Sequence, residues 1–354
     1  MRRNSWVYPR STVGLDLGDR KSVICELDAA ATVVKRATVA TTRAAMCAYF
    51  GRRSGSRVVL EAGTHSPWVS RMLEELGHEA VVANPSAVYG PRRRKKRNDR
   101  MDAEFLARQG RADVQLLHPI EHRRLQAQEH LAVIRARDQL VRSRTKLINH
   151  VRGSVKAQGD RIGRCSTESF PRQAHRQVPG EMRIAVFPLL DVIAELTTRI
   201  HDFDRPIQAI VVQSYPEALR LQQLRGVGAL TALAFVLLVD DPYRFTRSRD
   251  VGACFGLVPR LDESGDGTPQ LRITKAGDEL GRRLLVSAAR YILGPHGPDC
   301  DLRRHGQKMA ERGGKIARKR AAIAVARKLA VLLHRLWVSA GHYDPDRQLR
   351  RRAA

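Results

Sequence analysis

The first third of the chain alternates strand and helix signals in one order, and this order restricts the fold more than any other feature. Strand-like runs separated by short polar turns predict a three-stranded antiparallel meander, over residues 11–17, 22–27 and 31–40. The segments that follow are predicted to be helix, strand, helix and strand, over residues 42–52, 57–60, 65–76 and 79–83. After a polar loop and a basic run, a further helix is expected from Asp99. A sheet with helices packed on it is therefore predicted.

Four acidic residues occupy particular places in this order. Asp16 lies inside an apolar strand, where an unpaired charge is costly to bury. Glu61 follows the fourth strand, and Asp99 and Asp102 lie on one side of the last helix. Each acid alone has a simpler explanation; the helix dipole, for example, favours acids at a helix start. Together, carboxylates from separate elements at one end of a sheet can hold two divalent ions beside a phosphodiester.

The composition is strongly basic and predicts a polyanionic partner. Lys and Arg number 63 against 36 Asp and Glu, so the net charge is +27, which favours DNA or RNA bound with strong salt dependence. A membrane surface is the rival partner, but no stretch reaches about 18 apolar residues, so no transmembrane helix is expected. The five scattered cysteines are typical of reduced thiols in a cytoplasmic protein. A basic run shortly before Asp99 is expected to bind phosphates, and it consists of Arg92, Arg93, Arg94, Lys95, Lys96 and Arg97.

The middle of the chain, residues 119–215, has few strand signals and predicts an antiparallel helical hairpin. One helix is expected over residues 122–148, and the segment 159–180 is expected to be irregular. Apolar residues in the second helix alternate spacings of four and three, a heptad pattern, at Leu189, Ile193, Leu196, Ile200, Phe203, Ile207 and Ile210. Pro206 is expected to kink this helix or mark a boundary. The hairpin either contacts another subunit or packs only within its own chain.

The last third contains two features that suggest nucleic-acid chemistry. Gly226 and Gly228 form a Gly-x-Gly turn that resembles a helix–hairpin–helix motif, whose turn amides contact a phosphate. The alternative is a tight helix–helix turn that needs glycine conformations. Ser264 lies in a glycine-rich loop among cations that include Arg272 and Lys275. A serine in such surroundings can attack a phosphodiester, although most Ser-Gly pairs are simply turns.

A long basic helix is expected over residues 315–339. Its apolar side is expected to be buried, while Arg318 and Lys319 point outward, where they contact either phosphate or only solvent. The final residues, 346–354, are expected to be disordered.

These motifs together resemble the DEDD transposases of the one-hundred-and-ten family of bacterial insertion sequences, which are Piv/MooV-like. The matching segments are VGLDLG, VLEAGT, NDRMDAEFLAR, LRGVGALTA and GLVPRLDESGDGTPQLRITKAGD. The resemblance implies an α/β RNase H-like (RuvC-like) domain over residues 1–118 and a helical coiled-coil connector over 119–215. It also implies a mainly α transposase domain over 216–345, with a helix–hairpin–helix-like motif. One departure is Asn98, where family members often carry Thr.

The resemblance also implies a site and partners. Asp16, Glu61, Asp99 and Asp102 would bind two Mg²⁺ or Mn²⁺ ions, and Ser264 would be the nucleophile. Such proteins act as dimers or tetramers whose active site is shared between subunits. They are guided by a structured non-coding RNA that pairs with donor and target DNA. The expected setting is the bacterial cytoplasm, at the nucleoid.

The expected function is therefore site-specific DNA recombination through a covalent phosphoserine intermediate. One alternative is a RuvC-like metal-dependent junction nuclease, which needs the four acids but not Ser264. Another is a non-catalytic nucleic-acid-binding protein, which needs neither. A tyrosine recombinase is disfavoured, since no matching Arg/His constellation accompanies Tyr243 or Tyr291.

Overall fold

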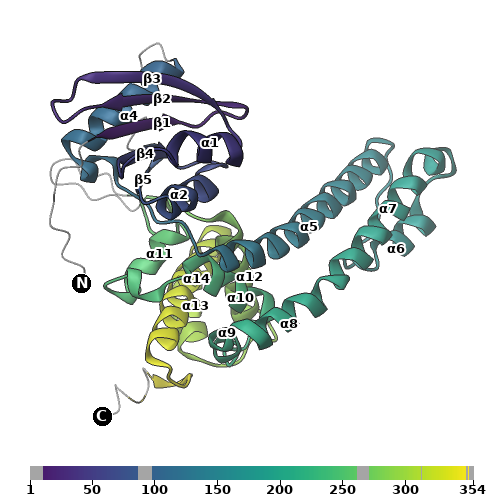
Figure 1. The fold of residues 1–354 in the computed structure, drawn as a ribbon. Coiled ribbons are helices and arrows are strands. Elements are labelled where there is room, and N and C mark those ends of the chain that lie inside the picture. Colours follow the sequence, from purple (N-terminus) through teal and green to yellow (C-terminus); the bar gives the residue numbers. More distant parts are fainter. Residues whose placement is uncertain (1–10, 87–97, 261–270, 312, 348–349, 351–354) are drawn as a thin grey trace. The chain divides into compact units, whose positions relative to one another are not determined.

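The computed structural model describes residues 11–86, 98–260, 271–311, 313–347 and 350. The chain divides into two compact units, Met1–His122 and Arg123–Ala354. The first is a mixed α/β unit with one sheet, and the second is mainly helical (Figure 1). The finer domain boundaries expected near residues 118 and 215 stay predictions. In the described part of the chain, no helix is long and apolar enough to cross a membrane.

The first unit is built on a five-stranded sheet in the order β3-β2-β1-β4-β5. Its strands are β1 (Thr12–Asp16), β2 (Lys21–Leu27), β3 (Val33–Ala40), β4 (Arg57–Glu61) and β5 (Glu79–Ala83). The first three pair in antiparallel fashion, which confirms the predicted meander. β4 is parallel to β1, and β5 is parallel to β4. The predicted order of strands and helices is confirmed, with closely matching bounds.

Helices cover both faces of this sheet, because successive side chains of a strand point to opposite faces. Val13 and Leu15 of β1 point to the face covered by α1 (Arg43–Phe50) and α2 (Ser66–Glu75), where Phe50 and Leu73 are also buried. Val59 of β4 points to the opposite face and packs with Leu106 of α4 (Asp99–Ala112). Figure 1 shows α4 alongside the sheet formed by β1, β2 and β3.

Small residues let α4 lie unusually close to the sheet. A methyl group added at Gly14 would overlap the carbonyl oxygen of Ala103 and lie 2.6 Å from the backbone nitrogen of Ala107. A methyl group at Gly110 would overlap the side chain of Val59.

Arg108 and Arg111 of α4 donate to the backbone carbonyls of Ala31 and Ala29, over 3.4 and 2.5 Å, in the turn that follows β2. Because β2 is antiparallel to β1, this turn lies beside the beginning of β1, so α4 runs opposite to β1 and to the parallel β4. Its first turn therefore lies towards their carboxyl ends.

The second unit contains the predicted helical hairpin, formed by α5 (Leu125–Ala157) and α7 (Arg183–Asp202). Ile193 and Ile200, from the heptad pattern, are buried within this chain. The pattern is thus explained by packing within the chain, and contact with another subunit stays a prediction. α7 is followed by α8 (Asp204–Ser214), whose first turn contains Pro206, so the expected boundary is confirmed.

We call residues 141–200 of this hairpin the arm. The arm has its own core, which includes Ile148, Val151 and Ile193. At its base, Arg137 of α5 forms an ion pair of 3.0 Å with Asp204 of α8. The segment 159–180, expected to be irregular, contains a helix, α6 (Phe170–Gln177). That expectation was wrong because a proline at the start of a helix, here Pro171, does not interrupt it.

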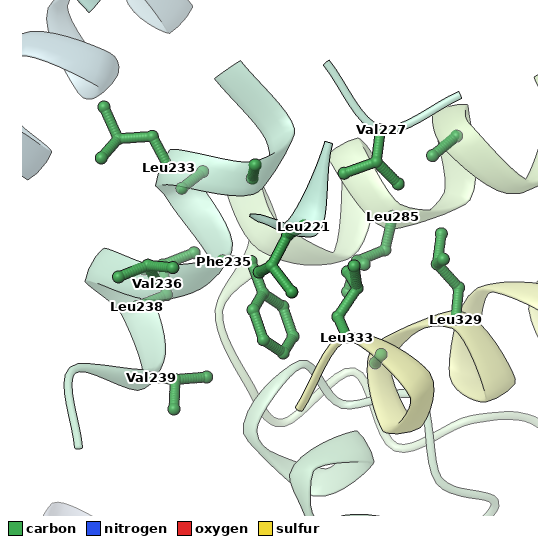
Figure 2. Close-up of a cluster of buried hydrophobic side chains, with 14 of the residues drawn as sticks. Leu221, Val227, Leu233, Phe235, Val236, Leu238, Val239, Leu285, Leu329 and Leu333 are labelled. Carbon is green, nitrogen blue, oxygen red and sulfur yellow. The ribbon is translucent and has the colours of Figure 1, made fainter. Parts of the chain in front are cut away.

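The rest of the second unit packs around α10 (Ala229–Val239), which is buried over residues 232–239. Figure 2 shows Phe235 of this helix among leucines from surrounding elements, Leu221, Leu285 and Leu333. Those elements are α9 (Pro216–Leu221), α12 (Glu279–Leu293) and α14 (Gly314–Ser339), and α13 (Asp301–Ala310) packs against α14. A 3₁₀ turn (Ser248–Asp250) leads directly into the short α11 (Val251–Cys254).

Candidate active site

Two of the predicted acids end neighbouring parallel strands. Leu15 of β1 pairs with Leu60 of β4, so Asp16 and Glu61 come next on adjacent strands. Alternation along each strand puts Asp16 on the same face as Gly14, and Glu61 on the same face as Val59. That face is the one covered by α4. Both carboxylates therefore lie at the carboxyl edge of the sheet, on the side of α4.

The other two acids lie in the first turn of α4. Asn98 caps this helix, because its side-chain oxygen accepts a hydrogen bond of 2.8 Å from the backbone N–H of Met101. Since α4 runs opposite to β1, Asp99 and Asp102 lie at the end of the sheet that carries Asp16. The positive end of the helix dipole also favours negative charge in this turn. The helix-start explanation therefore applies to both acids, and their role in a site stays a prediction.

The electrostatics of Asp16 reflect the charges of the other three acids. Its pKa is raised from 3.8 to about 6, mainly because it is partly buried. The negative charges of Asp99, Asp102 and Glu61 raise it further, in that order. Acids that are separated by many residues in the sequence thus act on one carboxyl group. Burial and the neighbouring negative charges disfavour the ionised form of Asp16, and a bound cation would stabilise that form.

The donor set fits a divalent cation in chemistry, because Mg²⁺ and Mn²⁺ prefer carboxylate oxygens. However, nowhere in the described residues are three or more His, Cys, Asp or Glu side chains arranged so that they could hold a metal ion as they stand. The four acids thus influence one another through their charges without forming a coordination site as they stand.

Two predicted parts of the site, Ser264 and the basic run at residues 92–97, lie outside the described residues, as does much of the C-terminal tail. The ends of the Ser264 loop are described. Pro259 and Ile273 form a β-bridge, and the N–H of Arg260 donates to the carbonyl of Arg272 over 2.9 Å. Arg272 and Lys275 are both exposed next to this bridge. They are therefore available to a polyanion that approaches the loop.

Other cations near this loop in the sequence stabilise the fold instead. Arg282 donates to the backbone carbonyls of Phe255 and Lys275, over 3.0 and 3.3 Å. Arg283 pairs with Asp138 of α5, over 2.5 Å. Both guanidinium groups are thus engaged within the second unit.

The Gly-x-Gly segment forms the predicted turn between two helices, α9 and α10. Gly226 has a φ of +97°, and a methyl group there would lie 2.9 Å from the ring of Tyr291. Gly228 is exposed, has an ordinary φ and precedes the first turn of α10. The conformational explanation therefore applies to Gly226, while contact with a phosphate stays a prediction for both glycines. Arg318 and Lys319 are exposed near the start of α14.

Sequence reasoning missed two features of this region. Gly14 permits the close approach of α4, and its signal was a glycine inside an apolar strand, which often marks close contact with another backbone. A hydrogen-bonded pair, His65 and Trp68, follows Glu61. Its spacing of three residues at a helix start was the available signal.

Comparisons with known proteins agree with the motifs. Residues 13–157 match the DEDD transposase family of IS110 elements, and residues 218–301 match a family described as "Transposase IS116/IS110/IS902 family". A transposase for the insertion sequence IS1111A of Coxiella burnetii is 29% identical over 91% of this chain and 88% of its own length. A probable family 20 transposase of Pseudomonas aeruginosa is 30% identical, over 80% of this chain and 84% of its own. A transposase for IS1328 of Yersinia enterocolitica is 28% identical, over 67% and 70%.

Proposed function

Because the chain belongs to the IS116/IS110/IS902 family of insertion-sequence transposases, we propose that it moves its own element by site-specific cutting and rejoining of DNA. The observation that supports this proposal is that the charges of three other acids in the same unit, Asp99, Asp102 and Glu61, raise the pKa of Asp16. A cluster of carboxylates in a chain of net charge +27 suits a protein that holds both divalent cations and a polyanion.

The N-terminal unit is proposed to be an RNase H-like, RuvC-like domain. An antiparallel meander followed by two parallel strands supports this, together with acids on the first strand, the fourth strand and a helix across one face. The helical hairpin would then be the connector, and the rest of the second unit the transposase domain.

Asp16, Glu61, Asp99 and Asp102 are the proposed metal ligands, for two Mg²⁺ or Mn²⁺ ions. When bound, the ions supply positive charge that polarises the phosphodiester. The protein's part is to hold the four carboxylates at one edge of the sheet. Ionised Asp16 is disfavoured without a cation, so its raised pKa is consistent with a site that gains stability when it is filled.

Ser264 is the proposed nucleophile. Its hydroxyl proton passes to a base in the solvent and its oxygen forms a bond to phosphorus. The bond between phosphorus and the sugar oxygen breaks, and that oxygen takes up a proton and leaves as a hydroxyl group. The phosphoserine ester keeps the energy of the broken bond, so a second strand can be joined without hydrolysis. The cations Arg272 and Lys275 flank the loop and would stabilise the charged transition state.

The proposed partners are donor and target DNA and a structured guide RNA, bound by an oligomer of two or four chains. Exposed cations support a polyanionic partner, with Arg318 and Lys319 on α14 as examples. The amides beside Gly226 and Gly228 would contact a phosphate. The basic run at residues 92–97 would bind phosphates next to the acid cluster.

The test uses the protein purified with its bound RNA, DNA carrying the ends of its own element, and Mg²⁺. Wild type is expected to form joined products and a protein–DNA adduct that survives a denaturing gel. Asp16→Asn is expected to abolish both, and Ser264→Ala to abolish the adduct and the joining. If Ser264→Ala still recombines DNA, the serine is not the nucleophile. Cleavage that needs Asp16 but never yields an adduct would instead support the junction nuclease.

A further inference from the structure

The loop that leaves β4 carries a histidine four residues after Glu61. His65 follows Glu61 by four residues, so its Cα lies within about 14 Å of the Cα of Glu61 even if the chain were fully extended. The loop leaves the carboxyl end of a parallel strand, which is where open α/β sheets bind their ligands. The imidazole of His65 is half-buried, so part of its surface remains accessible.

The backbone around His65 is held by its own hydrogen bonds. The buried hydroxyl of Ser66 accepts from the N–H of Gly63 over 2.9 Å and donates to the carbonyl of Gly63 over 2.8 Å. The carbonyl of His65 accepts from the N–H of Val69 over 3.1 Å, as part of the first turn of α2. The position of the histidine is thus set before any ligand arrives.

Trp68 fixes which nitrogen of His65 carries the proton. The indole Nε1–H donates to Nδ1 of His65 over 3.2 Å, and the two rings meet edge to face at 90°. Because an indole nitrogen can only donate, Nδ1 must be an acceptor, and the neutral imidazole then carries its proton on Nε2. The Arg43 guanidinium lies 6.0 Å from the centre of the Trp68 ring and pairs with Glu75 at 3.7 Å. Arg43 of α1 therefore lies over the Trp68 ring, and Glu75 of α2 holds Arg43 in turn.

We propose that His65 donates its Nε2–H to a phosphate oxygen of the nucleic-acid strand held at the acid cluster, and that Trp68 is a positioning residue for it. This inference rests on the proposed function. The four carboxylates can only accept hydrogen bonds when ionised, and so can a phosphate. A strand held there needs a donor from the protein, and His65 is a preoriented donor on the loop that begins at Glu61.

The experiment measures the rate of strand joining with saturating element-end DNA, the affinity for that DNA, and the melting temperature of each purified variant. His65→Ala is expected to slow joining about 10- to 100-fold, the range for a lost hydrogen bond to a charged group. His65→Gln keeps an N–H donor and should recover part of the rate. Trp68→Phe keeps the packing but frees the imidazole, so it should slow joining less than His65→Ala. DNA affinity should stay nearly constant, because many phosphates contribute to it.

The matched control is His130→Ala, in the second unit. His130 also pairs with an aromatic residue, Tyr215, whose hydroxyl lies 3.0 Å from its Nδ1. The His130→Ala variant should have a lower melting temperature, but the folded protein should join DNA at the wild-type rate. Wild-type joining by His65→Ala, or no recovery by His65→Gln, would overturn the inference. If Asp16→Asn is inactive while His65→Ala is fully active, only this inference fails; if Asp16→Asn also joins DNA normally, the proposed function fails.

Discussion

Single residues decide how α4 meets the sheet. Gly14 lies two positions before Asp16 on β1. Because Gly14 has no side chain, the backbone of Ala103 can pack directly against it. The acids of α4 lie in the turn just before this contact. The spacing between helix and sheet therefore also sets the spacing between Asp16 and the pair Asp99 and Asp102. A change that lifts the helix is expected to disturb the candidate site as well as the packing.

Gly14→Ala tests this dependence. The added methyl group overlaps the backbone of Ala103, which cannot move without α4, so unfolding in urea should show a loss of about 1–3 kcal/mol, the usual range for overpacking. Stabilisation of the protein by Mg²⁺ should also be reduced. Gly63→Ala is the matched control, since a methyl group there meets nothing within 4 Å. Equal stability of the two variants would contradict the described packing of α4.

Asp16→Asn should stabilise the metal-free protein, in a pH-dependent way. The pKa of Asp16 is about 6 in the folded protein against an ordinary 3.8, so the folded state binds this proton more tightly than the unfolded chain does. The stabilising contribution of the protonated group is complete below about pH 4 and is lost as the pH rises through 6. In EDTA, the variant should therefore melt above wild type at pH 8, and the difference should shrink towards pH 4. A constant difference would exclude this cause.

At the scale of elements, the turn between α9 and α10 separates two roles of glycine. Gly226 has the positive φ that the turn requires and lies against Tyr291 of α12. Gly228 has neither constraint and faces outward. The position that needs a left-handed conformation and the position predicted to contact a phosphate thus lie two residues apart on one turn, so they can be tested separately.

Gly226→Ala should destabilise the second unit by about 1–2 kcal/mol, the cost of a left-handed conformation for alanine. Gly228→Ala should leave thermal unfolding almost unchanged. If the turn contacts a phosphate, Gly228→Ala should still weaken DNA binding, because its methyl group stands where the phosphate would approach. Thermal melts and fluorescence anisotropy with the same duplex measure both effects. Unchanged binding by Gly228→Ala would remove this turn from the proposed interface.

The sequence predicted the elements of the first unit well, because its strands are short apolar runs bounded by polar turns. It also predicted that Asp16 and Glu61 would lie at one end of the sheet. It did not predict the contact of Gly14 with Ala103, because two segments far apart in the chain create it. The α6 helix was missed because Pro171 is a helix breaker at most positions and is tolerated at a helix start.

At the scale of the whole molecule, ion pairs within the fold neutralise only part of the positive charge. Some cations are paired, as Arg36 and Arg108 are with Glu104, each over 2.8 Å. Others stand exposed in a row at the start of α14, where Arg318, Lys319 and Arg320 follow one another. Paired and exposed cations should therefore contribute differently to the binding of a polyanion.

Replacing Arg318, Lys319 and Arg320 together by alanine should weaken DNA binding and flatten its dependence on salt. The slope of log K against log salt is negative, and each lost phosphate contact reduces its magnitude by about 0.9, so the magnitude should decrease by at most about 2.7. Anisotropy titrations from low to moderate NaCl measure it. The control replaces Arg36 and Arg108, whose charges are already paired. An equal change of slope in both variants would show that no particular surface is involved.

The ion pair at the base of the arm has a consequence for how such chains can vary. Arg137 and Asp204 form an ion pair, so the chain enters and leaves the arm at neighbouring points of the second unit. The arm has its own hydrophobic core. The core of the rest of the second unit is separate and includes Leu131, Ile134 and Ile207. The free-energy cost of closing a loop rises only slowly with its length. A change in the length of the arm should therefore cost little stability, because the rest of the second unit keeps its own packing.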